Sequence, residues 1–237
     1  MSAEVCVVRL TKPPVLYLRP FAHDEKAVTV PRPESLGGVK PTMAYGLLPW
    51  IALKLVSRAL PITREQIFVQ TLEGIAPTVA IGRPGERLRP LGAPRVYIDH
   101  GHWQPLVVRL IRISRLIFLE LGVTHGVTWE ITQAIAEATP NQLLFHLPAS
   151  GINREAAWRQ FMKCLSASGR VPEISLKENT DVHETAFAFF TSDWQLRTIG
   201  YRLASEDDVA GAENRVLARL LRDRFALSPT KALGSTA

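Results

Sequence analysis

The residues best suited to chemistry lie in one stretch, 114–131, where a short apolar run is followed by a turn containing Gly and Thr and then by a helix start. The run 116–119 has the length and branching of a strand buried on both faces. Strand, glycine-containing turn and helix N-terminus is the arrangement in which α/β sheets bind ligands, at the carboxyl ends of their strands. Glu130 falls at the start of the helix at this ligand-binding edge, with Thr128 as the expected N-cap. Its carboxylate either takes part in a reaction there or only favours the positive end of the helix dipole.

Asp24 and Glu86 are the candidates for a second acid, and both fall in expected loops.

Three further candidates lie next to Glu130 in the chain. Thr124 and Thr128 either bind a ribose through their hydroxyl groups or cap the helix. Trp129 either stacks on nicotinamide or adenine, or packs in the core. The loop histidines have no pair with zinc-ligand spacing, so we predict no metal site.

Two other loops supply candidates for substrate binding. Arg19 and Phe21 follow the first expected strand, where Arg19 suits a phosphate and Phe21 suits stacking on a base. The alternatives are a surface ion pair for Arg19 and an aromatic at the core edge for Phe21. Arg83, in the turn Gly82-Arg83-Pro84-Gly85, is a candidate for binding pyrophosphate.

Composition favours a globular domain that binds anions. The 237 residues are 46% hydrophobic, enough for a sizeable core, and the net charge of +6 favours anionic ligands. The basic residues are scattered along the chain, so there is no strong nucleic-acid signal. The longest apolar stretch, 43–53, contains Pro49, and we predict no transmembrane segment. Cys6 and Cys164 lack metal-ligand spacing and fit a reducing, cytoplasmic compartment.

Strands that alternate with helices predict an α/β fold with a doubly wound, mostly parallel sheet covered on both faces. The expected strands are 15–18, 78–81, 95–98, 116–119, 143–147, 187–190 and 196–201. The expected helices are 43–60, one that begins after Pro61, 103–113, 130–138, 154–168 and 206–225. The segment 22–41 is polar and rich in Pro and Gly, which predicts a long loop.

Three places in this pattern resemble the bacterial TIR-like group of the flavodoxin-like Rossmannoid folds. They are the opening strand with its loop ending in Asp24, the Pro-Gly turn at Arg83, and the stretch 114–130. The resemblance implies a TIR-like α/β domain over 13–170 and a C-terminal extension over 171–227, made of an edge strand and an amphipathic helix. A disordered tail is expected over 228–237.

The resemblance implies an NAD(P) glycohydrolase in bacterial signalling or defence, with Glu130 as the catalytic carboxylate. It cleaves the nicotinamide–ribose bond, so NAD(P) is its substrate and no cofactor is expected. Many TIR enzymes act only when assembled, which implies a homo-oligomer. The alternative is a non-catalytic TIR-like module for nucleotide sensing or self-assembly, in which Glu130 only caps its helix.

A second resemblance implies a related reaction. The usual TIR pattern sets the Trp a full turn before the Glu, whereas Trp129 and Glu130 are adjacent here. The sequence Gly126-Val127-Thr128-Trp129-Glu130 also resembles the Gly-Thr-x-Glu turn of nucleoside-binding Rossmannoids related to the lysine-decarboxylase-like phosphoribohydrolases. That family implies a nucleotide N-glycosidase. The two resemblances share a Glu that acts on an N-glycosidic bond. Breaking such a bond produces an oxocarbenium-like ribosyl group, which a carboxylate either stabilises or attacks. A positively charged nicotinamide leaves without protonation, so one carboxylate suffices for that leaving group.

Overall fold

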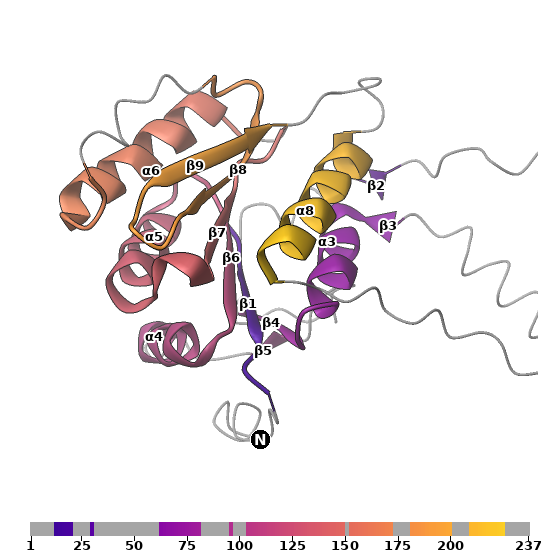
Figure 1. Ribbon diagram of the computed structural model, residues 1–237, viewed down its shortest axis with the longest axis horizontal. Helices are drawn as coiled ribbons and strands as arrows, with labels where there is room; N and C mark the ends of the chain where they lie inside the picture. Colours follow the sequence, from indigo (N-terminus) through magenta and orange to yellow (C-terminus); the bar gives the residue numbers. More distant parts are fainter. Residues whose placement is uncertain are drawn as a thin grey trace, which may run out of the picture.

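The computed structural model describes residues 12–20, 29–30, 62–81, 95–96, 103–149, 152–172, 181–200 and 209–225. These residues form a layered α/β structure with a central sheet and helices on both of its faces (Figure 1). In spatial order, the described strands of the sheet are β5 (Arg95–Val96), β4 (Thr78–Ile81), β1 (Val15–Leu18), β6 (Leu116–Glu120), β7 (Leu143–His146), β8 (Thr185–Phe190) and β9 (Leu196–Gly200). The helices are α3 (Arg64–Glu73), α4 (Trp103–Ile113), α5 (His125–Glu137), α6 (Arg154–Ser168) and α8 (Val209–Phe225).

The predicted α/β class with a mostly parallel sheet is confirmed. Strands β5, β4, β1, β6 and β7 are parallel, β8 runs antiparallel to β7, and β9 runs antiparallel to β8. Counted along the described chain, the parallel strands have the spatial order 3-2-1-4-5, which is that of the Rossmann dinucleotide-binding sheet. Without the two-residue edge strand β5, the parallel strands have the order 2-1-3-4, which agrees with the start of the flavodoxin-like order 2-1-3-4-5.

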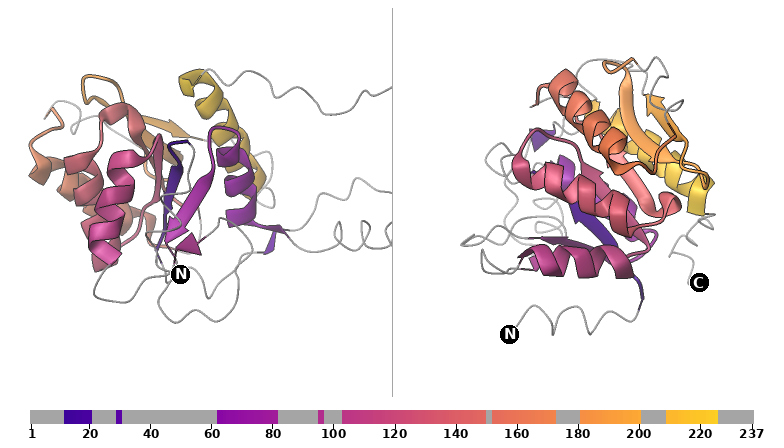
Figure 2. Two further views of the ribbon diagram at one scale, coloured as in Figure 1. Left: turned by 90° about the horizontal axis from the view of Figure 1, so that it is seen from below. Right: turned by 90° about the vertical axis from the view of Figure 1, so that its left-hand side faces the viewer.

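Alternating strand residues build a core on each face of the sheet. Leu16 and Leu18 point toward the layer that contains α4, α5 and α6, whereas Val15 and Tyr17 point toward α3 and α8. The two further views agree that α4, α5 and α6 cover one face and that α3 and α8 cover the other (Figure 2). The sheet is therefore doubly wound, as predicted.

The helices that follow the neighbouring strands β1 and β6 in the chain lie on opposite faces of the sheet. The chain after β1 leads to α3 on one face, and the chain after β6 leads to α5 on the other. Such a topological switch point is where open α/β sheets bind ligands, at the carboxyl ends of the strands. Here the segments leaving the two strands touch, since a Cβ added at Gly122 would lie 3.0 Å from Cγ of Pro20.

Most element boundaries agree with the sequence, and α5 is the main correction. Helices α4 and α6 span the predicted residues, and Asn153 caps α6 as expected by accepting a hydrogen bond from N–H of Ala156. Helix α5 begins at His125 rather than at Glu130, and its N-cap is Thr124 rather than Thr128. The Thr124 hydroxyl accepts a hydrogen bond from N–H of Val127, which stabilises the helix start although the chain there resembles a turn.

The antiparallel side of the sheet extends further than predicted. Strand β8 was expected at the edge, but β9 pairs with it along its length and forms the outer strand. The hairpin between them closes at Trp194, whose positive φ of 64° is uncommon for a residue other than glycine. The Trp194 ring packs on Phe190 at a centroid distance of 5.2 Å, and Arg170 lies 5.5 Å from its centroid.

Some predicted segments fall outside the described residues, namely the helix over 43–60 and the tail over 228–237. Within the segment predicted as a long loop, β2 (Thr29–Val30) forms an antiparallel pair with β3 (Ile62–Thr63). Among the helices that the structure describes, none is long and apolar enough to cross a membrane.

Candidate active site

Glu130 lies in the second turn of α5, inside the protein. Because Thr124 is the N-cap and His125 the first helical residue, the first turn of α5 contains no acidic residue. The Glu130 side chain faces the core with only 4% of its surface exposed. Its Oε2 is buried without a hydrogen-bond partner among the described residues. The role of capping its own helix, which was one of the two predictions for Glu130, belongs to Thr124 instead.

The environment of Glu130 favours its neutral form. Burial raises the pKa of this carboxyl group from 4.5 to about 8, so most molecules carry it protonated at pH 7. A buried polar group without a partner destabilises a fold, and a pKa shifted by burial marks a candidate functional group. In its protonated form Glu130 can donate a proton.

Glu130 lies on the side of α5 that faces α4. Seven residues further along the helix, and so on the same side, Glu137 accepts a hydrogen bond of 2.8 Å from Nε of Arg112 in α4. At the other end of this interface, the rings of Trp129 and Trp103 meet edge to face at 4.7 Å between centroids. Both tryptophans lie in the first two turns of their helices, near the carboxyl edge of the sheet. Trp129 thus packs against protein, which agrees with the core alternative predicted for it.

The two threonines make local hydrogen bonds. Besides the cap to Val127, the carbonyl oxygen of Thr124 accepts the hydroxyl of Thr128 at 3.1 Å and its N–H at 3.0 Å. These hydrogen bonds satisfy backbone N–H groups at the start of α5, and they match the capping alternative predicted for Thr124.

Arg19 forms an ion pair with Glu65 of α3. Two residues after Tyr17, it lies on the face covered by α3, and its Nη1 is 3.1 Å from Oε2 of Glu65. Both side chains are largely buried, with 9% and 13% of their surface exposed. The grouping of Arg19 with Glu130 remains a prediction: the ion pair lies on the α3 side of the sheet, whereas α5 covers the other face. Phe21, Asp24 and Arg83 lie outside the described residues, so their roles remain predictions.

A second group of polar residues, which sequence reasoning missed, is buried between the sheet and the helices α3 and α8. We call it the Glu213 cluster; it consists of Tyr17, Arg64, Glu120, His146 and Glu213. Arg64 donates two hydrogen bonds to the Glu213 carboxylate, of 2.9 Å from Nε and 3.1 Å from Nη2. Nε2 of His146 lies 3.2 Å from the same carboxylate, which also accepts N–H of Ala149 at 3.1 Å.

Glu120, the last residue of β6, contacts the other strand residues of the cluster. Its Oε2 accepts a hydrogen bond of 3.3 Å from the Tyr17 hydroxyl and lies 3.9 Å from Nδ1 of His146. Burial alone would lower the pKa of His146, but Glu213 and Glu120 raise it above 6.5. Burial alone would raise the pKa of Glu213, but His146 and Arg64 lower it below 4.5. The cluster therefore holds opposite charges together in the protein interior.

The cluster connects α3 and α8 to the strands. The rings of Phe68, Phe118 and Phe187 surround the His146 imidazole, with centroids 4.9, 5.9 and 5.1 Å away. His146 and Glu213 have no exposed surface, so the cluster acts as a structural anchor. One signal in the sequence was available: Glu213 falls four residues before Leu217 and seven before Leu220, on the apolar stripe of α8.

Comparison with protein-family models, curated proteins and solved structures returns no match. Among the residues that the structure describes, no group of three or more His, Cys, Asp or Glu is arranged to hold a metal ion. Glu130 and the switch point therefore carry the functional argument.

Proposed function

We propose that the protein is a nucleotide N-glycosidase in which Glu130 is the catalytic acid. The observation that carries the proposal is Glu130 in the second turn of α5, whose Oε2 is buried without a hydrogen-bond partner among the described residues and whose pKa burial raises to about 8. The Rossmann strand order supports it, because the switch point between β1 and β6 lies at this edge and suits a nucleotide.

The protonated state of Glu130 favours a substrate with an uncharged base. Such a base leaves more easily when a proton reaches one of its ring nitrogens, and a carboxylic acid with a pKa near the working pH is suited to that step. Glu130 gives its proton to the base, the bond between C1′ and the nitrogen breaks, and water adds to C1′ and returns a proton to Glu130. The products are the free base and a ribose phosphate. This matches the phosphoribohydrolase resemblance.

NAD(P) is the second candidate substrate, from the TIR resemblance. Nicotinamide carries a positive charge while attached to ribose and leaves without protonation, so Glu130 would act there only as a carboxylate. That form becomes the major one above a pH of about 8. The bacterial signalling or defence setting and the homo-oligomeric form belong to this candidate.

The test is release of a free base by the purified full-length protein. AMP, GMP, NAD and NADP are incubated with wild type at high protein concentration from pH 6 to pH 10, and the products are separated by chromatography. We expect release from the nucleoside monophosphates that declines as the pH rises through about 8 and is lost in Glu130→Gln. Glu137→Gln is the matched control, because Glu137 lies two turns away on the same side of α5.

The other outcomes separate the candidates. Nicotinamide release that increases through the same pH range, and depends on Glu130, assigns the NAD(P) reaction instead. No release from any of these substrates, with Glu130→Gln changing only stability, refutes catalysis and leaves the interaction module.

A further inference from the structure

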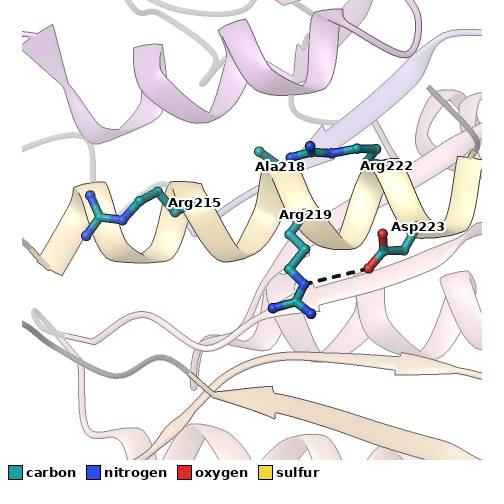
Figure 3. Close-up of a pocket in the computed structure, with 5 residues that line it drawn as sticks. All are labelled: Arg215, Ala218, Arg219, Arg222 and Asp223. Atoms are coloured by element: carbon teal, nitrogen blue, oxygen red, sulfur yellow. Dashed lines mark ion pairs between the residues drawn. The ribbon is translucent and has the colours of Figure 1, made fainter. Parts of the chain in front are cut away.

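The outer face of α8 carries a row of arginines. Arg215, Arg219 and Arg222 follow one another at intervals of four and three residues, which places them on one side of the helix within two turns (Figure 3). Their side chains are exposed, whereas Leu217 and Leu221 on the opposite side are buried against the core. The structure thus gathers basic residues that looked scattered in the sequence.

These arginines line a hollow in the surface. Its volume is about 470 Å³, and its other described lining residues are Ala218 and Asp223. Sites for small molecules commonly measure about 300 to 1,000 Å³, so the hollow has the size of a small ligand. Ala218 lies one turn from both Arg215 and Arg222, and the Arg222 side chain extends back toward it (Figure 3).

The described lining is basic. It combines three guanidinium groups with the one carboxylate of Asp223. The Asp223 Oδ2 lies 3.9 Å from Nε of Arg219, and the two side chains are 67% and 79% exposed, so this pair is weak and open to competition. Guanidinium groups present planar pairs of N–H donors that fit phosphate oxygens.

We propose that this hollow binds a small ligand that carries several phosphate groups. A membrane surface fits the site poorly, because the apolar side of α8 is buried in the protein. Helix α8 and Glu130 lie on opposite faces of the sheet. The hollow is therefore separate from the proposed glycosidase site, and the inference does not depend on that function.

The experiment is a calorimetric titration of the full-length protein with inorganic triphosphate at low ionic strength. Arg219→Gln and Arg222→Gln each remove one guanidinium from an exposed position, and we expect each to weaken binding about tenfold. Ala218→Leu fills the hollow without changing the charge and should also weaken binding. Asp223→Asn removes the competing carboxylate and should strengthen it. Arg159→Gln, on the exposed side of α6, is the matched control and should leave binding unchanged.

Binding that follows this pattern, and weakens as salt is added, supports the proposal. Three results overturn it: no binding of triphosphate, equal binding by wild type and the α8 variants, or an equal loss with Arg159→Gln. Binding of a single-stranded oligonucleotide without binding of triphosphate also overturns it, because the site would then recognise a nucleic acid.

Discussion

Replacing Glu130 with Gln should make the protein more stable, and by an amount that grows with pH. The substitution keeps the size of the side chain and fixes it in an uncharged form. In the wild type, burial raises the pKa of Glu130 from 4.5 to about 8. Below pH 4.5 the carboxyl group is protonated in both the folded and the unfolded chain, so it does not affect stability through ionisation. As the pH rises from 4.5 to about 8, the unfolded chain loses this proton while the folded protein keeps it, and the folded state becomes less favourable.

The size of the effect follows from the two pKa values. Each pKa unit corresponds to about 1.4 kcal/mol. With a pKa of about 8 in the folded state and 4.5 in the unfolded state, proton linkage lowers the free energy of unfolding by about 1 kcal/mol at pH 5. The same calculation gives about 3 kcal/mol at pH 7 and about 5 kcal/mol at pH 9. The amide introduced by Glu130→Gln does not ionise, so the free energy of unfolding of the variant does not decrease with pH for this reason.

Urea denaturation of wild type and Glu130→Gln at pH 5, 7 and 9 measures the difference directly. Titration of all other groups is common to both proteins and cancels in the comparison. Glu137→Gln is the control: Glu137 is partly exposed and its pKa is lowered by Arg112, so its difference from wild type should stay constant over this range. A stability difference for Glu130→Gln that does not change with pH would refute the reasoning, because Glu130 would then ionise normally in the folded protein.

Three further predictions concern the anchor and the switch point. Glu213→Gln should lower the free energy of unfolding by about 3 to 5 kcal/mol in urea denaturation at pH 7, because it leaves buried cations with a weakened partner; a loss below about 1 kcal/mol would contradict the anchor role. The raised pKa of His146 contributes stability that is fully present below pH 6.5 and is lost as the pH rises through the pKa of the folded state, so the advantage of wild type over His146→Gln should shrink with increasing pH across that range. Gly122→Ala should cost about 1 to 3 kcal/mol, because the new Cβ would lie 3.0 Å from the rigid Pro20 ring. Gly126→Ala, where the added Cβ meets nothing within 4 Å, should instead raise thermal stability, and equal effects of the two would contradict the close contact at Gly122.

The sequence predicted the layers of the fold because these depend on local patterns. Short apolar runs gave β1, β4 and β6, and the periodic pattern of α4 gave both of its ends. The start of α5 was predicted five residues too late, because Gly126 suggested a turn. The hydrogen bond from Val127 to the Thr124 hydroxyl stabilises the helix there in spite of the glycine.

The site was harder to predict because its contacts are distant in the chain. The alternation of side chains along β1 relates Arg19 to Tyr17, but nothing local indicates that Glu65, on α3, is its partner. The Glu213 cluster combines residues from five elements, with 149 residues between Arg64 and Glu213. Only the place of Glu213 on an apolar stripe is visible before the chain is folded, and that pattern alone does not distinguish an anchor from a catalytic group.

Glu130 and Glu213 differ in their partners and in the direction in which their pKa values shift. Both are buried glutamates on helices that cover the sheet, so burial does not distinguish them. Glu213 is surrounded by Arg64, His146 and a backbone N–H, and its pKa falls, so its charge stabilises the fold. The Oε2 of Glu130 has no such partner among the described residues and the pKa of Glu130 rises, so it costs stability at neutral pH. A buried acid whose pKa rises is a candidate for proton transfer, so our proposal assigns the reaction to Glu130, whereas the paired Glu213 anchors the fold.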